Sequence, residues 1–274
     1  MLVFTSDKER LLRHFRKDPV LFAYHIGDLD DFYFPDTQWA VIYNVTAKVE
    51  DVVLTYYGGK IPTILAFGLT ERFEQLLDEL LEISPRQFYV HYQQRSHASL
   101  ARRYTITPLG THWKMHLKNP PQAVGYPLER FAQQAVRHPE ELGVDVRQLD
   151  SSHEPELLSL YNRSYPGNYF RPRMLQSGKY FGAFDGDRLA AVAGVHVDSA
   201  EYKTAALGNI VTDEEYRRRG LASIVTGHLC EELISEGKLV SLNVKADNHP
   251  AIRCYEKLGF VKTHEFEEAL CELV

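Results

Sequence analysis

The stretch NIVTDEEYRRRGLA, residues 209–222, decides how the rest of the chain can be interpreted. It starts within an apolar run, residues 205–212, whose composition predicts a strand. It ends where apolar residues begin to recur at every fourth position, from Leu221 to Leu233, as they do on one face of an amphipathic helix. The order strand, arginine-glycine turn, helix is therefore the first structural prediction.

The arginine-glycine turn at the start of this predicted helix indicates anion binding. A helix N-terminus presents unpaired backbone N–H groups and the positive end of the helix dipole. Gly220 and Ala222 leave room for a phosphate, so we expect the amides of residues 218–222 to cradle a pyrophosphate. Three consecutive side chains would add positive charge: Arg217, Arg218 and Arg219. A basic loop before an ordinary surface helix is the alternative that this stretch alone leaves open.

The residues that follow predict a second strand and a second helix. Gly237 stands where the first helix should end, and residues 239–244 have the composition of a strand. Asn248 is a helix-capping residue, and Pro250 stands near the first helical position after it. One face of this second helix is expected to carry Ala251, Ile252, Tyr255 and Leu258.

Two motifs in this order resemble the GNAT superfamily of acyl-CoA-dependent N-acyltransferases. The acyl-CoA motif of that family is Arg or Gln, two residues, Gly, one residue, then Gly or Ala, and residues 217–222 fit it. The later signature of the family is matched in order by Asn248, Ala251, Tyr255, Gly259 and Phe260. The run GNIVT at 208–212 further resembles the branch that includes glycine N-acyltransferases. The close resemblance covers roughly residues 179–266.

The resemblance implies an α/β (α+β) fold of mixed sheets flanked by helices, with acetyl-CoA or another acyl-CoA as the co-substrate. The cofactor-binding residues that it implies are Ile210, Val211, Thr212, Arg217, Arg218, Arg219, Gly220, Leu221, Ala222, Asn248 and Tyr255. For Asn248, a plain helix cap is the alternative. Cys254 neighbours Tyr255 but should point elsewhere on the helix, which indicates a buried filler more than a nucleophile.

Acyl transfer to an amine requires a held thioester, a deprotonated amine, a stabilised oxyanion and a proton for the leaving thiolate. Pantetheine can pair with the backbone of residues 209–212 as an added strand pairs with a sheet edge. An N–H near Ile210 or Val211 could then point at the thioester oxygen. The matching tyrosine of the family protonates the thiolate, so Tyr255 is the expected acid; a core tyrosine is the alternative.

The general base is the least defined part of the predicted site. His196, in a predicted strand at the acceptor pocket, could take the ammonium proton near neutral pH, and a half-buried structural histidine is the alternative. Asn209 could orient a water instead. A group of residues before the central hairpin should either cover the acceptor, with an arginine on its carboxylate, or form a solvated loop: Tyr165, Tyr169, Phe170, Arg171 and Arg173.

Composition limits the class of protein. The 274 residues suffice for one large or two ordinary domains, and 44% hydrophobic and 25% charged residues are typical of a soluble globular protein. The net charge of −6 disfavours general binding to nucleic acid or to an anionic membrane. Three cysteines without metal-type spacing, and no apolar run of signal or membrane-span length, predict a cytoplasmic protein. No metal site is expected, because the acidic group Asp28, Asp30 and Asp31 has no matching oxygen ligands.

The first half of the chain repeats the element order of the second half without visible sequence identity. We therefore predict tandem GNAT-like domains: a degenerate copy at 1–120, a linker at 121–142 and a catalytic domain at 143–274. In the first half, residues 67–72 (FGLTER) occupy the place of the acyl-CoA turn and lack a glycine after an arginine pair. This half is accordingly expected not to bind acyl-CoA.

The leading functional hypothesis is an N-acyltransferase that moves an acetyl or short acyl group to the amine of a small molecule, with amino acids among the candidates. A non-catalytic acyl-CoA-binding regulator with the same cradle is the alternative. A transferase that uses charged tRNA is a third reading, against which the net charge of −6 argues. The sequence leaves open the acceptor, the acyl length and whether the chain forms a homodimer.

Overall fold

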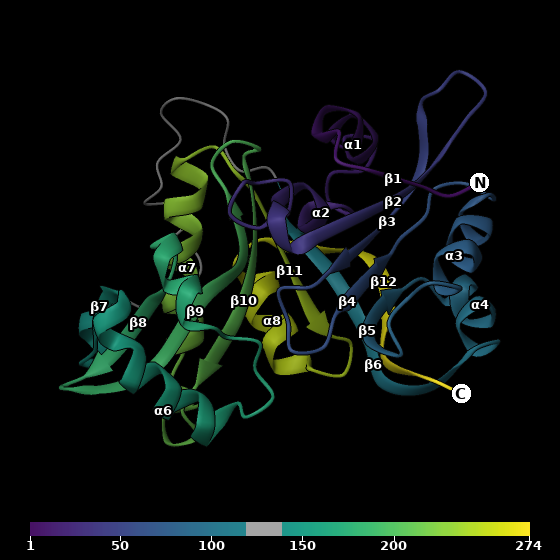
Figure 1. Cartoon of the computed structure of the whole chain (residues 1–274). Coiled ribbons are helices and arrows are strands. Elements are labelled where there is room, and N and C mark those ends of the chain that lie inside the picture. The colour runs from purple at the N-terminus through teal and green to yellow at the C-terminus, as the bar shows by residue number, and fades with distance from the viewer. Residues whose placement is uncertain (119–138) are drawn as a thin grey trace. The chain divides into compact units, whose positions relative to one another are not determined.

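The computed structural model describes residues 1–118 and 139–274 (Figure 1). Most of the predicted linker, residues 121–138, lies outside the described residues, and its last residues form a 3₁₀ helix, η3 (Pro139–Leu142). The chain divides into two compact units. Unit 1 comprises Met1–Lys114, Val244–Asp247 and Thr263–Val274, and unit 2 comprises Met115–Asn243 and Asn248–Lys262.

Unit 1 contains a mixed sheet, and its helices lie between the strands in the order of the chain. Its elements in chain order are β1 (Val3–Thr5), α1 (Lys8–Phe15), α2 (Ala23–Gly27), η1 (Phe34–Asp36), β2 (Thr37–Tyr43), β3 (Val49–Tyr56), β4 (Thr63–Ala66), α3 (Phe73–Leu81), β5 (Gln87–Tyr92), η2 (Gln94–Ser96), α4 (His97–Ala101), β6 (Tyr104–Leu117) and, from the far end of the chain, β12 (Phe260–Leu273). The order of the strands is β1-β2-β3-β4-β5-β12-β6. Strands β4 and β5 run parallel, whereas β5 and β12 run antiparallel.

The last strand of the chain pairs inside unit 1. Glu267 lies opposite Tyr92, and Glu272 lies opposite Gln87. The predicted division had instead assigned all of residues 143–274 to one C-terminal domain. No local sequence pattern reports a pairing between segments so far apart, which is why the prediction did not contain it. The division into domains at residues 120 and 143 stays a proposal. Any such division has to include the pairing of β12 with β5.

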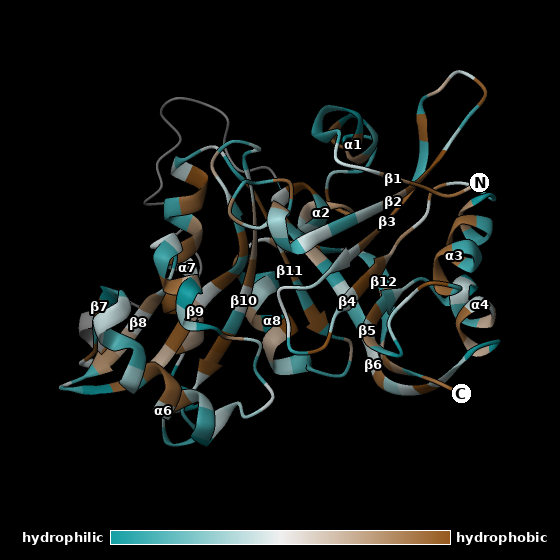
Figure 2. Cartoon of the chain, in the orientation of Figure 1, coloured by the Kyte–Doolittle hydropathy of each residue, from teal (hydrophilic) through white to brown (hydrophobic). Residues whose placement is uncertain are grey.

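Helix α3 illustrates why the sequence folds as it does in unit 1. Apolar residues at spacings of three and four give it one buried face: Phe73, Leu76, Leu77, Leu80 and Leu81. Figure 2 shows this helix with an apolar side and a hydrophilic side. The buried face packs against apolar residues of β2 to β5 and of β12, including Ile42, Val53, Val90 and Cys271.

Lys114, on β6, is a buried amine with 2% of its surface exposed. Its Nζ lies 4.7 Å from the ring centroid of Phe67 and 5.2 Å from those of Tyr24 and Phe266. Aromatic faces attract an ammonium ion, and the Asp18 carboxylate adds to that attraction. Burial nevertheless outweighs both effects and lowers the pKa of Lys114 to about 7.

We expect Lys114→Met to remove a pH dependence of stability between about pH 7 and 10.5. In this window the unfolded chain keeps a proton on Lys114 that the folded chain has released, so the stability of the wild type rises with pH through it. Methionine fills a similar volume against the rings without a charge. Urea unfolding near pH 7 and pH 9 checks this. The exposed Lys118 provides a matched control, Lys118→Met, which should keep the wild-type slope.

Unit 2 contains residues 209–222, with the arginine-glycine turn. Its elements are η3, β7 (Asp145–Gln148), η4 (Ser151–His153), α6 (Glu154–Ser164), η5 (Pro172–Ser177), β8 (Phe181–Asp185), β9 (Arg188–Ser199), β10 (Thr204–Thr212), η6 (Glu214–Tyr216), α7 (Leu221–Ser235), β11 (Leu239–Lys245) and α8 (His249–Lys257). The strand order is β11-β10-β9-β8-β7, with β10 parallel to β11 and antiparallel to β9. The predicted order of strand, turn, helix, strand and helix is confirmed here.

Two glycines mark the ends of α7. Gly220 precedes the helix with φ 93°, and Gly237 follows it with φ 72°. Both values lie in the left-handed region, where a residue with a Cβ is strained. None of the helices in residues 1–118 and 139–274 has the length and apolar character needed to span a bilayer.

Candidate active site

Strands β10 and β11 stop pairing halfway along β10. Their parallel register runs from Thr204 opposite Leu239 to Leu207 opposite Leu242. Residues 208–212 have no partner on β11 in the described part of the chain. The backbone at this point can therefore accept a further extended segment, and the amide-rich pantetheine arm of an acyl-CoA has the required donors and acceptors.

A β-bulge lies at the same point of β10. Gly208 is opposite Gly194 of β9 and Val211 is opposite Val192, so β10 has one residue more than β9 between the two pairs. Asn209 sits in the bulge with φ 55°, a left-handed conformation that asparagine tolerates better than most residues. Asn209 and Ile210 thus leave the regular ladder with β9 just after the last pair of β10 with β11.

The N-terminus of α7 has the geometry of an anion cradle. Besides Gly220, Arg218 also has a positive φ, 65°. No atom lies within 4 Å of the position that a Cβ on Gly220 would take. The backbone amides of residues 218–222 donate to no acceptor among the residues that the structure describes. Five consecutive donors next to an open position match what a pyrophosphate needs.

The three arginines of the turn differ in what they already contact. Arg217 forms an ion pair with Glu214, with 3.2 Å between Nη2 and Oε1. Arg219 donates from Nη2 to the backbone carbonyl of Glu215 at 3.2 Å. The guanidinium of Arg218 contacts neither a carboxylate nor a carbonyl within the described chain. Arg218 is therefore the cation with the most capacity left for a phosphate.

We expect Arg218→Gln to weaken CoA binding about tenfold and Arg217→Gln to weaken it by much less. A charge-assisted contact contributes about 1.5–3 kcal/mol, and exposure to solvent reduces that value. Both variants remove one charge from the same turn, so each is the control of the other. Calorimetric titration with CoA at low and moderate salt measures the difference. Equal losses in the two variants would show that the turn acts only through its total charge.

Helix α8 places Tyr255 and Asn248. The Asn248 side chain accepts from the Ala251 amide at 3.2 Å, so its predicted capping role is confirmed, while a contact to the cofactor stays a prediction. Tyr255 is 8% exposed, and its ring lies 6.0 Å from that of Phe260. Burial raises the pKa of Tyr255, which keeps its hydroxyl protonated at neutral pH. The hydroxyl donates to none of the described residues, so its proton is available.

His196 and the predicted acceptor loop lie together over β10. The rings of His196 and Tyr169 are 5.9 Å apart and nearly perpendicular, and the Arg171 guanidinium lies 5.2 Å from the Tyr169 ring. A Cβ on Gly208 would stand 2.3 Å from the His196 ring, so the glycine makes room for the imidazole. The structure thus brings the candidate base to the start of the bulge. Either role predicted for His196, base or structural residue, is compatible with this position.

Asp213, which was not among the predicted site residues, fixes the end of β10. Its Oδ2 accepts from Arg163 and from Arg188, each at 2.9 Å. Burial alone would raise the pKa of Asp213, but these hydrogen bonds hold it below its usual value. The Asp213 amide also donates to the carbonyl of Ala190 at 2.8 Å. Asp213 therefore anchors the turn that leads to the cradle, and nothing in the sequence links it to its distant partners.

Cys254 lies beside the cradle helix without nucleophilic character. Its Sγ is 3.1 Å from Oγ of Ser223 on α7. Burial raises the pKa of the Cys254 thiol, so the thiolate is scarce at neutral pH. This environment agrees with the expectation of a packing residue.

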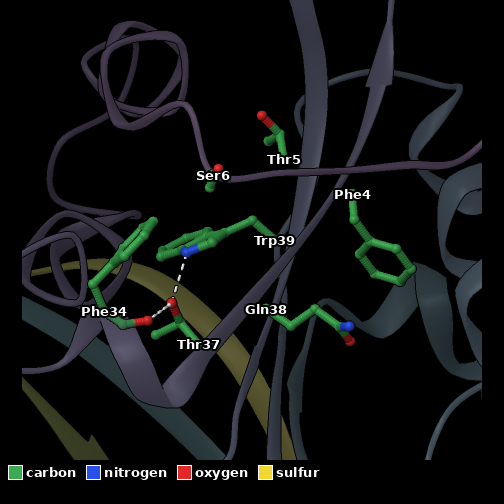
Figure 3. A pocket seen from close by; sticks show the side chains of 7 residues that line it. All are labelled: Phe4, Thr5, Ser6, Phe34, Thr37, Gln38 and Trp39. Atoms are coloured by element: carbon green, nitrogen blue, oxygen red, sulfur yellow. Dashed lines mark hydrogen bonds between the residues drawn. The ribbon is translucent and has the colours of Figure 1, made fainter.

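Unit 1 has a hollow of about 290 Å³ whose lining lacks the catalytic groups of the candidate site in unit 2 (Figure 3). The residues that line it are Phe4, Thr5, Ser6, Phe34, Thr37, Gln38 and Trp39. The Thr37 hydroxyl accepts from Nε1 of Trp39 at 2.7 Å and donates to the Phe34 carbonyl at 2.6 Å, so it is already engaged. None of these residues was predicted to act in catalysis, and the hollow has no titratable side chain for acid–base chemistry.

The loop of unit 1 that takes the place of the acyl-CoA turn already holds an anion of its own. Asp51, on β3 and fully buried, accepts from the Leu69 amide at 2.8 Å, from the Thr70 amide at 3.2 Å and from the Thr70 hydroxyl. The Gly68 amide donates to Oε1 of Gln93 at 3.1 Å. The backbone amides of this loop in unit 1 are therefore already paired. The amides at the corresponding place in unit 2, residues 218–222, are unpaired within the described chain.

The comparison with protein families points to unit 2. Residues 145–260 match the acetyltransferase (GNAT) family. This range includes the bulge, the arginine-glycine turn and Tyr255. A [ribosomal protein bS18]-alanine N-acetyltransferase from Salmonella typhimurium is 43% identical over 75 residues, which are 27% of this chain and 49% of that protein. The corresponding Escherichia coli K12 protein is 44% identical over 57 residues, 20% of this chain and 38% of the relative. The chain spans about half or less of the length of these curated relatives.

Solved structures resemble the whole chain. A Drosophila protein superposes with a TM-score of 0.69 at 14% identity, covering 100% of this chain and 98% of the other. A tandem GNAT protein from the clavulanic acid biosynthesis pathway gives 0.58 at 14% identity, covering 99% and 98%. A GCN5-related N-acetyltransferase from Sphaerobacter thermophilus gives 0.59 at 13% identity, covering 99% and 95%. Identities this low concern the fold alone, and they confirm the predicted class of mixed sheets flanked by helices.

Proposed function

We propose that unit 2 is an acyl-CoA-dependent N-acyltransferase of the GNAT type, which moves an acetyl or short acyl group to the amine of a small molecule. The observation that carries the proposal is the run of unpaired amides at residues 218–222 around the open position at Gly220. The phosphate groups of a pyrophosphate are among the anions that such a helix start binds. The parting of β10 and β11 after Leu207 supplies an edge for pantetheine close by in the sequence.

The proposed reaction joins the amine to the acyl group and releases a thiol. The amine nitrogen attacks the thioester carbon, a C–N bond forms, and the carbonyl oxygen becomes an oxyanion that an N–H of Ile210 or Val211 stabilises. Collapse of this intermediate breaks the C–S bond. The sulfur leaves with the electron pair and takes the proton of Tyr255. His196 is the proposed acceptor of the ammonium proton, directly or through a water.

Unit 1 is proposed not to bind acyl-CoA, because Asp51 occupies its loop. We expect calorimetry on the full chain to give one CoA per polypeptide. The full chain is the right sample, since a fragment of residues 1–120 would lack β12, which pairs with β5. A stoichiometry of two, or one that Gly220→Glu leaves intact, would contradict this assignment.

The acceptor class is the finer part of the proposal. Arg171 beside Tyr169 suits a substrate that carries a carboxylate near its amine, such as an amino acid. The relatives that share part of unit 2 are named for acetylating an alanine of a ribosomal protein, so a peptide is the competing acceptor. Thiol release from acetyl-CoA should be compared for alanine, for ethylamine and for a peptide that begins with alanine. The proposal expects alanine to be preferred, and expects Arg171→Gln to abolish its advantage over ethylamine.

We propose a cytoplasmic location, because the three cysteines are free thiols and form no disulfide with one another. Cys230, Cys254 and Cys271 are free thiols, and two of them are buried. A reducing compartment preserves such thiols. Fractionation of cells that express the tagged chain tests this location.

A further inference from the structure

Asn209 is bonded to protein at both ends of its side-chain amide. It is 3% exposed. Its Nδ2 donates to Oη of Tyr180 at 3.0 Å and faces Sδ of Met174 at 3.6 Å. Its Oδ1 accepts from the Tyr169 amide at 3.2 Å, and its backbone carbonyl accepts from Oη of Tyr161 at 2.8 Å. The bulge residue is therefore held at its side chain and at its backbone.

The two tyrosine side chains that contact Asn209 are themselves fixed by packing. Tyr180 is fully buried and donates from Oη to the carbonyl of Val195 on β9 at 3.0 Å. Its ring covers Gly194, where a Cβ would stand 2.1 Å away. Tyr161, on α6, is 1% exposed. Helix α6, the residue that precedes β8 and the loop at Tyr169 thus meet at a single residue of β10.

We propose that Tyr161, Tyr180 and Asn209 are positioning residues, which hold the bulge so that an N–H of Ile210 or Val211 faces the thioester oxygen. This inference rests on the function proposed above. It replaces the earlier hypothesis of a water oriented by Asn209, because both ends of that amide are already bonded to protein. None of the three residues needs to touch the substrate.

The physical argument lies in the conformation of the bulge. Without its anchors, Asn209 would gain by leaving the left-handed conformation at φ 55°, and the two bulge residues, Asn209 and Ile210, would adopt several conformations between the pairs that flank them. The N–H groups after the bulge would then turn away. The loss of one aligned oxyanion donor costs about 10²–10³ in rate. The cradle at residues 218–222 has its own geometry, so the binding of the nucleotide part should persist.

Two variants and a matched control test the proposal. Tyr161→Phe removes the donor to the Asn209 carbonyl and keeps the ring. Asn209→Gly keeps the left-handed conformation accessible but removes both side-chain anchors. The control is Tyr104→Phe, because Tyr104 is a buried tyrosine of unit 1 that donates to the Leu81 carbonyl at 3.2 Å. We expect kcat to fall about tenfold or more in the first two variants, with CoA affinity within threefold of wild type, and neither to change in the control.

A purely structural role predicts another pattern. All three variants would then melt at a lower temperature and turn over at nearly the wild-type rate when folded, which would overturn the proposal. Amide hydrogen exchange of residues 207–212 provides a readout without catalysis, and faster exchange there in Tyr161→Phe and Asn209→Gly is expected. If the wild type transfers no acetyl group, the proposed function fails, and the exchange rates alone then decide whether these side chains hold the bulge. Unchanged amide hydrogen exchange of residues 207–212 in both variants would by itself show that these side chains do not hold the bulge.

Discussion

Gly220→Glu is expected to lower the affinity for CoA by about a hundredfold or more in a folded protein. Gly220 faces open space at the cradle, and a carboxylate there would meet the pyrophosphate. Charge-assisted phosphate contacts contribute about 1.5–3 kcal/mol each, and about 1.4 kcal/mol is a factor of ten in affinity. The new residue also has to adopt φ 93°, which costs about 1–2 kcal/mol for a residue with a Cβ. Calorimetry measures the affinity, and circular dichroism checks the fold.

Two controls separate charge from backbone strain. Gly220→Gln has the same size and the same strained φ but no charge, so the difference between the two variants isolates repulsion of the phosphate. Leu69→Glu places the same charge in the corresponding loop of unit 1, where Leu69 is 38% exposed, and should leave CoA binding unchanged. Gly68 is unsuitable for this control, because a Cβ there would stand 2.0 Å from the Phe73 ring. Near-normal affinity in folded Gly220→Glu would place the pyrophosphate elsewhere.

Tyr255→Phe is expected to lower kcat by about 10²–10⁴-fold, the range of general acid–base catalysis, with little change in KM for acyl-CoA. The variant keeps the ring against Phe260 and removes only the hydroxyl proton. The Tyr255 hydroxyl is protonated across neutral pH, because burial raises a pKa that ordinarily already lies well above 7. Steady-state kinetics must be measured where chemistry limits turnover.

The melting temperature of Tyr255→Phe distinguishes a catalytic acid from a tyrosine that only packs in the core. The Tyr255 hydroxyl has no hydrogen bond to the described residues, so its removal should leave stability nearly unchanged or slightly higher. A turnover within about threefold of wild type would remove Tyr255 from the mechanism and leave solvent as the proton source.

The parts of the site that follow from local chemistry were predictable from the sequence. A glycine before a run of apolar residues predicted the start of α7, and the structure places Gly220 there in the left-handed region. The amphipathic character predicted for this helix is wrong, because its buried residues lie on all of its sides. Asn248 followed by Pro250 predicted the capped start of α8, and the Asn248 side chain does cap the Ala251 amide. These features depend on residues within one turn of each other, so the pattern of the chain contains them.

The parts that depend on distant segments were not predictable. Asn209 was recognised, but its anchors Tyr161 and Tyr180 lie 48 and 29 residues away, and only the fold brings them together. The Asp51 carboxylate lies 18 and 19 residues from the amides that it accepts from, with nothing in the sequence to mark it as a substitute for phosphate. Long-range pairing of polar groups follows burial and register, which no single window of sequence reports.

Amine-dependent release of free CoA thiol from acetyl-CoA by the full chain, with the product identified by mass spectrometry, tests the proposed acyl transfer directly. We expect thiol to appear faster in the presence of a suitable amine, in equal amount to an N-acetylated product, and we expect Gly220→Glu to lose both. If the full chain binds CoA at the cradle and yet no amine from a broad panel accelerates thiol release, the protein is not an N-acyltransferase.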